Sequence, residues 1–163
     1  MSDKGTSPDW SRVAAGFDLW LPQLAPVGET LLDALGARPG ELILDVACGT
    51  GEPALTLARR NPDLRVTAVD AAGPMVEVAS AKAAREGLRN VTFRTLAAEV
   101  LDFPDATFDR IVCRFGVMLF ADPLAGVRQC LRVLRPGGVF AFAVWGRPEM
   151  MRNCLWAYEA FCG

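Results

Sequence analysis

The chain has 163 residues, of which 52% are apolar and 22% charged, so we predict one globular domain and exclude an intrinsically disordered chain. The net charge of −2 arises from 17 basic and 19 acidic residues, so the sequence offers no basic surface for nucleic acid. No apolar run approaches the roughly 20 residues that span a bilayer. The first ten residues lack the apolar region of a signal peptide, and we therefore expect a cytoplasmic protein.

Histidine is absent and the five cysteines form no CxxC pair, which limits the chemistry that the chain can support. Without imidazole the chain lacks the commonest general base and the commonest zinc ligand. An odd number of unpaired cysteines is typical of buried thiols in a reducing compartment. We therefore expect neither a metal site nor a disulfide framework.

Two helices are predicted before the first strand, after a flexible tail over residues 1–9. Apolar residues recur with the spacing of one helical face from Trp10 until Pro22 interrupts the pattern. A second helix is predicted over residues 23–35, with Gly36 as its C-terminal stop.

Strands and helices then alternate along the rest of the chain. The predicted strands are residues 41–46, 65–70, 91–96, 109–115 and 138–145. The predicted helices between them are residues 53–60, 74–86 and 123–134. On the last helix, the predicted apolar face comprises Leu124, Val127, Leu131 and Leu134. The arginines expected to face solvent there are Arg128, Arg132 and Arg135.

Such alternation with short loops predicts an α/β fold, a Rossmann-like, doubly wound parallel sheet of about five strands. One domain is expected over residues 10–163, with an N-terminal helical segment (10–36), a Rossmann-like core (41–145) and a terminal helix (147–163). Ligands of such sheets bind beyond the carboxyl ends of the central strands. The turns after the first two strands are therefore the expected site.

The turn after the first strand has the Gly-x-Gly spacing of dinucleotide-binding sites, at Gly49 and Gly51. Asp45 stands just before this turn and Glu52 just after it. At about 4 Å, each contact between such a carboxylate and a pyrophosphate would cost on the order of 4 kcal/mol, which disfavours NAD. S-adenosylmethionine carries a sulfonium and an ammonium group and no phosphate, so it fits better. Asp70, which ends the second strand, is then expected to accept hydrogen bonds from both ribose hydroxyls.

Four motifs in order, LDVACGTG, VDAAGPM, FPDATFDRIVCRFGVMLFADP and LRVLRPGGVFAFAVW, resemble those of class I S-adenosylmethionine-dependent methyltransferases. The resemblance extends over residues 10–148 and is strongest to the branch of ubiquinone and menaquinone C-methyltransferases. It implies an enzyme that transfers a methyl group from S-adenosylmethionine to a small-molecule acceptor. The cofactor-binding residues that it implies are Asp45, Ala47, Cys48, Gly49, Gly51, Asp70, Ala71, Met75, Ala98, Glu99, Arg114 and Phe115.

The resemblance also implies individual roles at the ends of the third and fourth strands. The Ala98 amide would serve a ring nitrogen of the adenine, and Arg114 and Phe115 would face the transferred methyl group. The family often has an acid for the adenine amino group where this chain has Ala97, and it is open whether Glu99 replaces that contact.

Several of these residues have a purely structural alternative. Asp45 either contacts the cofactor or caps the turn, and Met75 either packs on the adenine or fills the core. Cys48 is expected to be a small buried group rather than a nucleophile. Arg114 either belongs to the site or pairs with Asp109 or a helix terminus. The aromatic side chains that belong either to the core or to a lid are Trp10, Phe17 and Trp20.

The family that the motifs resemble normally continues past the fifth strand into a helix and two closing strands. We expect one helix but no counterpart of the two strands after Trp145. The strand over 138–145 is then expected to lie at an exposed edge of the sheet, and such an edge invites pairing with another chain. We expect either a fragment of a longer enzyme or a homodimer through this edge. The alternative function is a non-catalytic module that binds S-adenosylmethionine or another protein.

Overall fold

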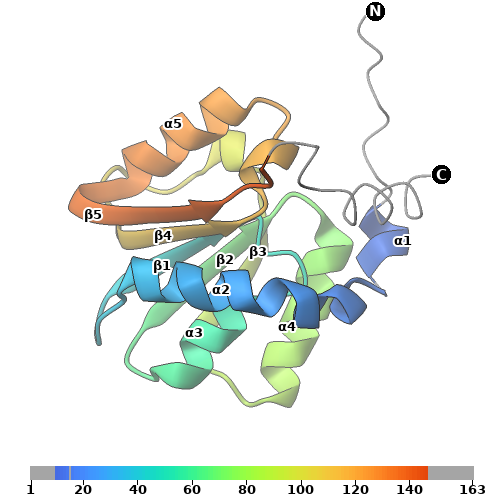
Figure 1. Ribbon diagram of the computed structural model, residues 1–163. Coiled ribbons are helices and arrows are strands. Elements are labelled where there is room, and N and C mark those ends of the chain that lie inside the picture. The colour runs from blue at the N-terminus through green and yellow to red at the C-terminus, as the bar shows by residue number, and fades with distance from the viewer. Residues whose placement is uncertain (1–9, 15, 147–163) are drawn as a thin grey trace, which may run out of the picture.

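The structure is a computed structural model that describes residues 10–14 and 16–146. The predicted tail over residues 1–9 and the predicted terminal helix over 147–163 lie outside the described residues. The helices are α1 (Trp10–Ala14), α2 (Leu21–Leu35), α3 (Ala54–Arg60), α4 (Gly73–Arg85) and α5 (Pro123–Val133), shown in Figure 1. The short 3-10 helices are η1 (Phe17–Trp20), η2 (Ala98–Val100) and η3 (Val117–Leu119). The strands are β1 (Leu42–Val46), β2 (Arg65–Asp70), β3 (Val91–Thr95), β4 (Phe108–Arg114) and β5 (Leu134–Ala143).

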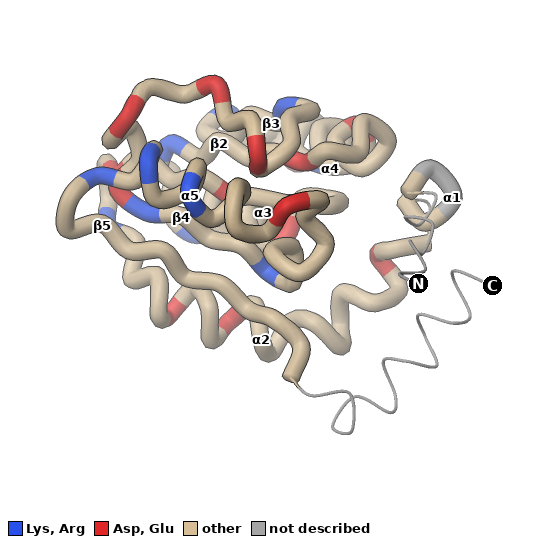
Figure 2. Tube along the Cα trace, turned by 90° about the horizontal axis from the view of Figure 1, so that it is seen from above, with Lys and Arg blue, Asp and Glu red and all other residues tan. Residues whose placement is uncertain are grey.

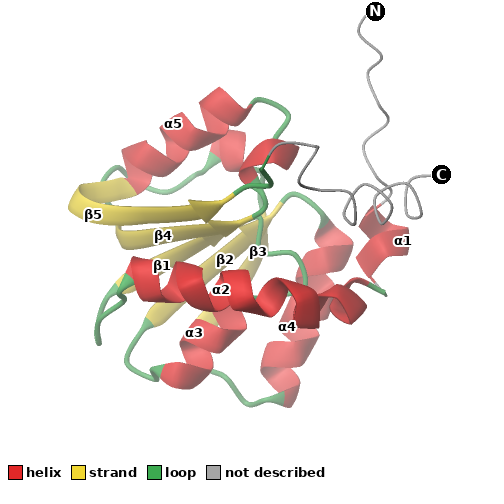
Figure 3. Cartoon of the chain, in the orientation of Figure 1, coloured by secondary structure: helices red, strands yellow, loops and turns green. Residues whose placement is uncertain are grey.

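All five strands are parallel and form one sheet in the order β3-β2-β1-β4-β5, which confirms the predicted Rossmann-like fold (Figure 3). The winding direction reverses between β1 and β4, because the chain leaves the β3 edge and returns beside β1. In the register of the sheet, Asp45 of β1 lies beside Ala68 of β2 and Val112 of β4. The carboxyl ends of these three strands therefore meet at one edge of the sheet.

Helices cover both faces of the sheet, with α2, α3 and α4 on one face and α5 on the other (Figure 1). The central strands are buried from both sides: Ile43 and Leu44 of β1 and Ile111 and Val112 of β4 are all 0% exposed. Consecutive apolar residues suit this arrangement because each face of a strand packs against a helical layer. Separate apolar clusters fill the two sides of the sheet.

The N-terminal helices differ from the sequence prediction at their boundaries. The first helix ends at Ala14, and the separate turn η1 precedes α2. Pro22 lies in the first turn of α2 rather than ending a helix. Proline fits there because the amide groups of a first helical turn have no intrahelical acceptor. Gly36 ends α2 with φ of +54°, as predicted.

The strand β5 begins at Leu134, four residues before the predicted strand. Leu134 pairs with Phe108, and the next paired residues are Arg110 and Val139, so an irregularity in the ladder contains the glycines at 137 and 138. Sequence periodicity does not reveal this early start, because a proline and two glycines are read as the end of a helix.

The predicted apolar face of α5 is partly wrong. Leu124 and Leu131 are 59% and 56% exposed, whereas Cys130 and Val133 are fully buried. Arg132 does not simply face solvent, because its guanidinium donates hydrogen bonds to the carbonyl oxygens of Leu101 (2.6 Å) and Phe103 (2.8 Å). Blue segments in Figure 2 mark the arginines of α5 and the neighbouring strands.

The strand β5 forms one edge of the sheet, and Phe142 on it and Val144 just after it are about half exposed. No strand among residues 10–14 and 16–146 pairs with its outer side. Within the same described residues, every helix is too short or too polar to cross a membrane.

Candidate functional site

The turn between β1 and α3 depends on a left-handed backbone at several residues. Ala47, Gly49 and Gly51 have φ values of +57°, +54° and +108°. A Cβ atom at Gly51 would lie 2.7 Å from Cδ1 of Leu55, so this position admits no side chain without a shift. The predicted role of both glycines in shaping the turn therefore agrees with the backbone geometry.

Asp70, at the end of β2, is joined directly to this turn. Its Oδ2 accepts a hydrogen bond from the amide of Gly49 (2.8 Å), and its Oδ1 accepts one from the amide of Ala72 (2.9 Å). Burial raises the pKa of this carboxyl, while the two amide donors act in the opposite direction. Each carboxylate oxygen has a second lone pair, so both can accept a further bond from a ligand. Ala71 follows at an exposed position.

Asp45 is 0% exposed and has one satisfied and one unsatisfied oxygen. Its Oδ2 accepts a hydrogen bond from the amide of Ala54 at the start of α3 (3.0 Å). Its Oδ1 has no partner among the described residues. Burial raises the pKa of Asp45 to about 8, although the nearby Arg114 opposes the shift. Asp45 thus caps the turn as one alternative predicted, and it also retains a free oxygen.

Glu52 does not contribute the open negative charge that we predicted. Its Oε1 pairs with the guanidinium of Arg59 (2.8 Å), and its Oε2 accepts from the hydroxyl (2.7 Å) and amide (3.1 Å) of Thr56. The sequence pattern placed this carboxylate beside a ligand, because the pattern does not reveal that residues of α3 pair with it. The negative charge of the site therefore rests on Asp70, and on Asp45 once it loses its proton.

The short helix η1 lies across the same turn. Cε1 of Phe17 is 3.8 Å from the position that a Cβ of Gly49 would take. Asp18 accepts a hydrogen bond from the hydroxyl of Thr50 (2.7 Å) and pairs with the ammonium group of Lys82 (2.6 Å). Sequence reasoning missed this group because residues 18, 50 and 82 are far apart in the chain and match no motif.

Two of the predicted site residues belong to the core in this structure. Met75 is 2% exposed and packs with Val13 and Ala14 of α1, as the core alternative predicted. Cys48 is 2% exposed, and burial raises the pKa of its thiol well above the usual range. A thiol held in its neutral form is a poor nucleophile, which agrees with the expected structural role.

The end of β4 reaches toward the turn from the opposite side. Arg114 donates a hydrogen bond from Nη2 to the carbonyl oxygen of Glu52 (3.1 Å). It does not pair with Asp109, which instead pairs with Arg135. The predicted alternative of an Arg114–Asp109 pair is therefore wrong.

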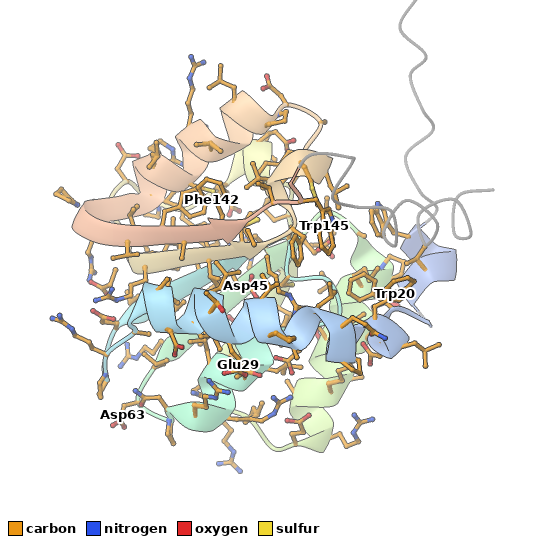
Figure 4. The ribbon with its side chains drawn as sticks, in the orientation of Figure 1. Trp20, Glu29, Asp45, Asp63, Phe142 and Trp145 are labelled. Atoms are coloured by element: carbon orange, nitrogen blue, oxygen red, sulfur yellow. The ribbon has the colours of Figure 1, made fainter. Side chains whose placement is uncertain are left out.

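Phe115 follows with φ of +61°, and its ring stacks on Trp145 with centroids 4.0 Å apart and planes 10° from parallel. Figure 4 shows Trp145 near this end of the sheet and Asp45 deeper inside. A Cβ at Gly116 would overlap the Cβ of Ala47, so the turns after β1 and β4 touch each other at this glycine.

The segment after β3 lies next to the site, and Glu99 contacts the residue before α5. The amide of Leu96 donates to the backbone oxygen of Asp70 (2.8 Å), which holds this segment beside the end of β2. Ala98 is buried, at 4% exposure. Oε1 of Glu99 accepts a hydrogen bond from the amide of Asp122 before α5 (3.2 Å). One oxygen of Glu99 thus already has a partner in the chain, and whether Glu99 replaces the acid missing at Ala97 stays a prediction.

A comparison with protein-family models identifies one match to this chain. The model is described as a methyltransferase domain, and it matches residues 43–138, from β1 to the irregular first part of β5. All of the predicted site residues lie within this range.

Comparisons with individual proteins also find proteins that are named as methyltransferases. A demethylmenaquinone methyltransferase of Thermus thermophilus is 38% identical over 135 residues, which are 79% of this chain and 60% of that protein. Among solved structures, the YcgJ protein of Bacillus subtilis is 37% identical with a TM-score of 0.64 over 73% of this chain and 48% of that one. A SAM-dependent methyltransferase from Aquifex aeolicus is 26% identical with a TM-score of 0.68, over 82% of this chain and 76% of that one. The chain thus spans about 40–60% of the length of the first curated relatives that it matches.

Proposed function

This chain belongs to the methyltransferase domain family, and from that membership we propose that it binds S-adenosylmethionine and transfers its methyl group to a small-molecule acceptor. The observation that carries the proposal is the hydrogen bond from the Gly49 amide to Asp70, which joins the glycine turn to the acid at the end of the neighbouring strand. A turn and an acid so placed lie at the switch point of the sheet, where ligands of such folds bind.

The residues present fit this cofactor. Asp70 keeps lone pairs for two ribose hydroxyls. Gly49 has no side chain, so a ligand can come close to its backbone once the ring of Phe17 moves aside. The unpartnered Oδ1 of Asp45 offers an acceptor for an ammonium donor, beneath the turn that the glycines form. A cation suits this position better than a phosphate, because Asp70 has no ion-pair partner among the described residues and a bound cation would also favour the charged form of Asp45.

When bound, the cofactor supplies an electrophilic methyl group on a sulfonium that leaves readily. The chain then has to align the acceptor with that methyl and exclude water, and alignment alone is worth about 7–11 kcal/mol in favourable cases. The sequence has no histidine, and burial keeps the Cys48 thiol protonated. We therefore propose that the acceptor is acidic enough to lose its own proton, or that a carboxylate takes it.

The names of the relatives support a small-molecule acceptor. The Thermus relative is named for demethylmenaquinone, an organic small molecule. We further propose that two copies of the chain pair through the outer side of β5. The unpaired outer side of β5 and the exposed apolar side chain of Phe142 on this strand support the pairing.

Calorimetric titration with S-adenosylmethionine, S-adenosylhomocysteine and NAD tests the proposed cofactor. We expect the first two to bind and NAD not to bind. NAD binding without S-adenosylmethionine binding would falsify the proposal. A screen of metabolite extracts with S-adenosylmethionine labelled in its methyl group then tests for transfer. Cofactor binding with no labelled product would instead favour a non-catalytic binding module.

A further inference from the structure

A cavity of about 350 Å³ lies between α2 and the turn that leads into α3. Leu21, Ala25 and Pro53 contribute apolar surface, and Arg114 lines it from the end of β4. Neither Asp45, Gly49 nor Asp70 lines this cavity, so it is separate from the surface proposed for the adenosine. Its volume is near the lower end of the roughly 300–1,000 Å³ found for small-molecule sites.

The acids that line this cavity already have cationic partners. Asp18 pairs with Lys82 (2.6 Å), Glu29 with Arg60 (2.7 Å) and Glu52 with Arg59 (2.8 Å). Figure 4 shows Glu29 on the helix α2, which forms one side of the cavity. The charge of each acid is therefore balanced by a residue of the chain itself.

Arg114, in contrast, has no ion-pair partner among the described residues. It is partly buried, and within this part of the chain its guanidinium makes one hydrogen bond, to the neutral carbonyl of Glu52. The acids whose charges act on Arg114 are Asp45 and Glu52. Glu52 is already paired with Arg59, and burial raises the pKa of Asp45 to about 8, which favours its uncharged form at neutral pH. The cavity thus carries one positive charge that the described residues leave unbalanced.

Gly28 of α2 leaves space above this charge. A Cβ at Gly28 would lie 3.4 Å from Nη1 of Arg114, and both residues line the cavity. Any side chain larger than alanine would therefore cover Nη1. A guanidinium presents a planar fork of N–H donors that matches a carboxylate in charge and shape.

We propose that Arg114 binds an organic carboxylate in this cavity, with the apolar side chains of α2 and Pro53 packing on its hydrocarbon part. The inference rests on the proposed function for the source of that carboxylate. It is either the amino-acid end of S-adenosylmethionine or an acidic methyl acceptor, and both present the same group to Arg114. In either case Arg114 contributes to ligand choice, because a neutral ligand leaves its charge unpaired.

The first experiment uses fluorine NMR to titrate the cofactor-free chain with 4-fluorobenzoate and with neutral 4-fluorobenzamide. We expect the benzoate to bind more tightly, and R114Q to remove that preference, a loss of about ten- to a hundredfold. R114K keeps the charge and is expected to keep part of the preference. A25L narrows the cavity at an exposed helix position without altering Arg114, and it is expected to weaken benzoate even if R114Q fails to fold.

The second experiment identifies the source of the carboxylate. Wild type and R114Q are titrated with S-adenosylmethionine and with its decarboxylated form. A preference for the carboxylated form that disappears in R114Q assigns the cofactor. Benzoate binding that survives saturation with S-adenosylhomocysteine, and is lost in R114Q, assigns the acceptor.

The proposal is overturned if wild type prefers neither carboxylate over its neutral counterpart, or if R114Q keeps both preferences. Failure of wild type to bind S-adenosylmethionine or S-adenosylhomocysteine overturns the proposed function instead. The benzoate titration is independent of that result, because it is carried out without cofactor.

Discussion

The amide of Gly49 lies 2.8 Å from Oδ2 of Asp70, and this hydrogen bond joins two residues that are 21 positions apart in the chain. It ties the turn after β1 to the end of β2. Any change at Asp70 therefore affects both the shape of the turn and the acceptor that we assign to the ribose.

The substitution Asp70→Ala tests that assignment. We expect it to weaken S-adenosylmethionine binding by a few kcal/mol, because two hydrogen bonds to a charged group are each worth about 1.5–3 kcal/mol. Calorimetry gives the affinity, and circular dichroism shows whether the fold is kept. Asp102→Ala is the matched control, since Asp102 is an exposed acid that pairs with Arg94, and it is expected to leave the affinity unchanged. Equal affinities for the two variants would place the ribose elsewhere.

The buried carboxyl of Asp45 predicts a specific pH dependence of stability. Burial raises its pKa to about 8, whereas an unfolded aspartate titrates near about 3.9. Between these values the folded chain holds a proton that the unfolded chain has lost. The contribution of Asp45 therefore lowers the free energy of unfolding as pH rises through this window, by up to about 1.4 kcal/mol per pH unit.

Urea denaturation of wild type and Asp45→Asn at pH 5, 6, 7 and 8 measures this contribution. The other acids titrate alike in both chains, so the difference between the two curves isolates Asp45. We expect the variant to gain stability relative to wild type as the pH rises. Two parallel curves would mean that Asp45 is ionised throughout.

The glycine at position 51 is required by both its backbone and its surroundings. Gly51→Ala places a Cβ at φ of +108° and 2.7 Å from Leu55, and we expect a loss of about 2–4 kcal/mol of stability. Gly40→Ala is the control, because Gly40 also has a positive φ, of +83°, but no atom lies within 4 Å of its added Cβ. It is expected to lose about 1–2 kcal/mol. Equal losses in chemical denaturation would show that Leu55 moves away freely.

The proposed pairing through β5 predicts the behaviour of one surface substitution. Phe142 is 49% exposed on the edge strand, and Phe142→Lys places there a charge of the kind that discourages strand pairing. Light scattering is expected to show a dimer for wild type and a monomer for this variant. Leu131→Lys makes the same change at a 56% exposed position on α5 and should leave the dimer intact. A monomeric wild type contradicts the proposed pairing.

The order of helices and strands could be predicted from the sequence because the signals were local. The strands β1 and β4 each contain three consecutive apolar residues, 42–44 and 111–113. Gly36 and the glycine turn mark boundaries by backbone requirements that depend on few neighbours. The predicted start of β5 was wrong because Leu134 pairs with Phe108, and no local sequence pattern predicts this contact.

The site was less predictable than the fold because charges are balanced over long sequence distances. Glu52 and Glu99 were identified as acids near a ligand, but the structure pairs them with Arg59 and with the amide of Asp122. Arg114 was selected through its family resemblance, and its unbalanced charge emerged only when the partners of the neighbouring acids were known. Composition gives the number of charges in a chain, but which charges pair with one another depends on how the chain packs.

The attachment of η1 through Asp18 has a consequence for the rate at which a ligand exchanges. The side chain of Asp18 is 44% exposed, so dissolved salt can screen its attraction to Lys82, whereas the contact of Phe17 with the glycine turn is apolar and insensitive to ions. If η1 must lift before a ligand passes, exchange accelerates with ionic strength. A ligand that depends on long-range attraction to the protein would slow down under the same conditions. Ligand exchange that accelerates with salt would therefore indicate that the lifting of η1 limits the rate. Exchange that slows with salt would indicate that the encounter of ligand and protein limits it.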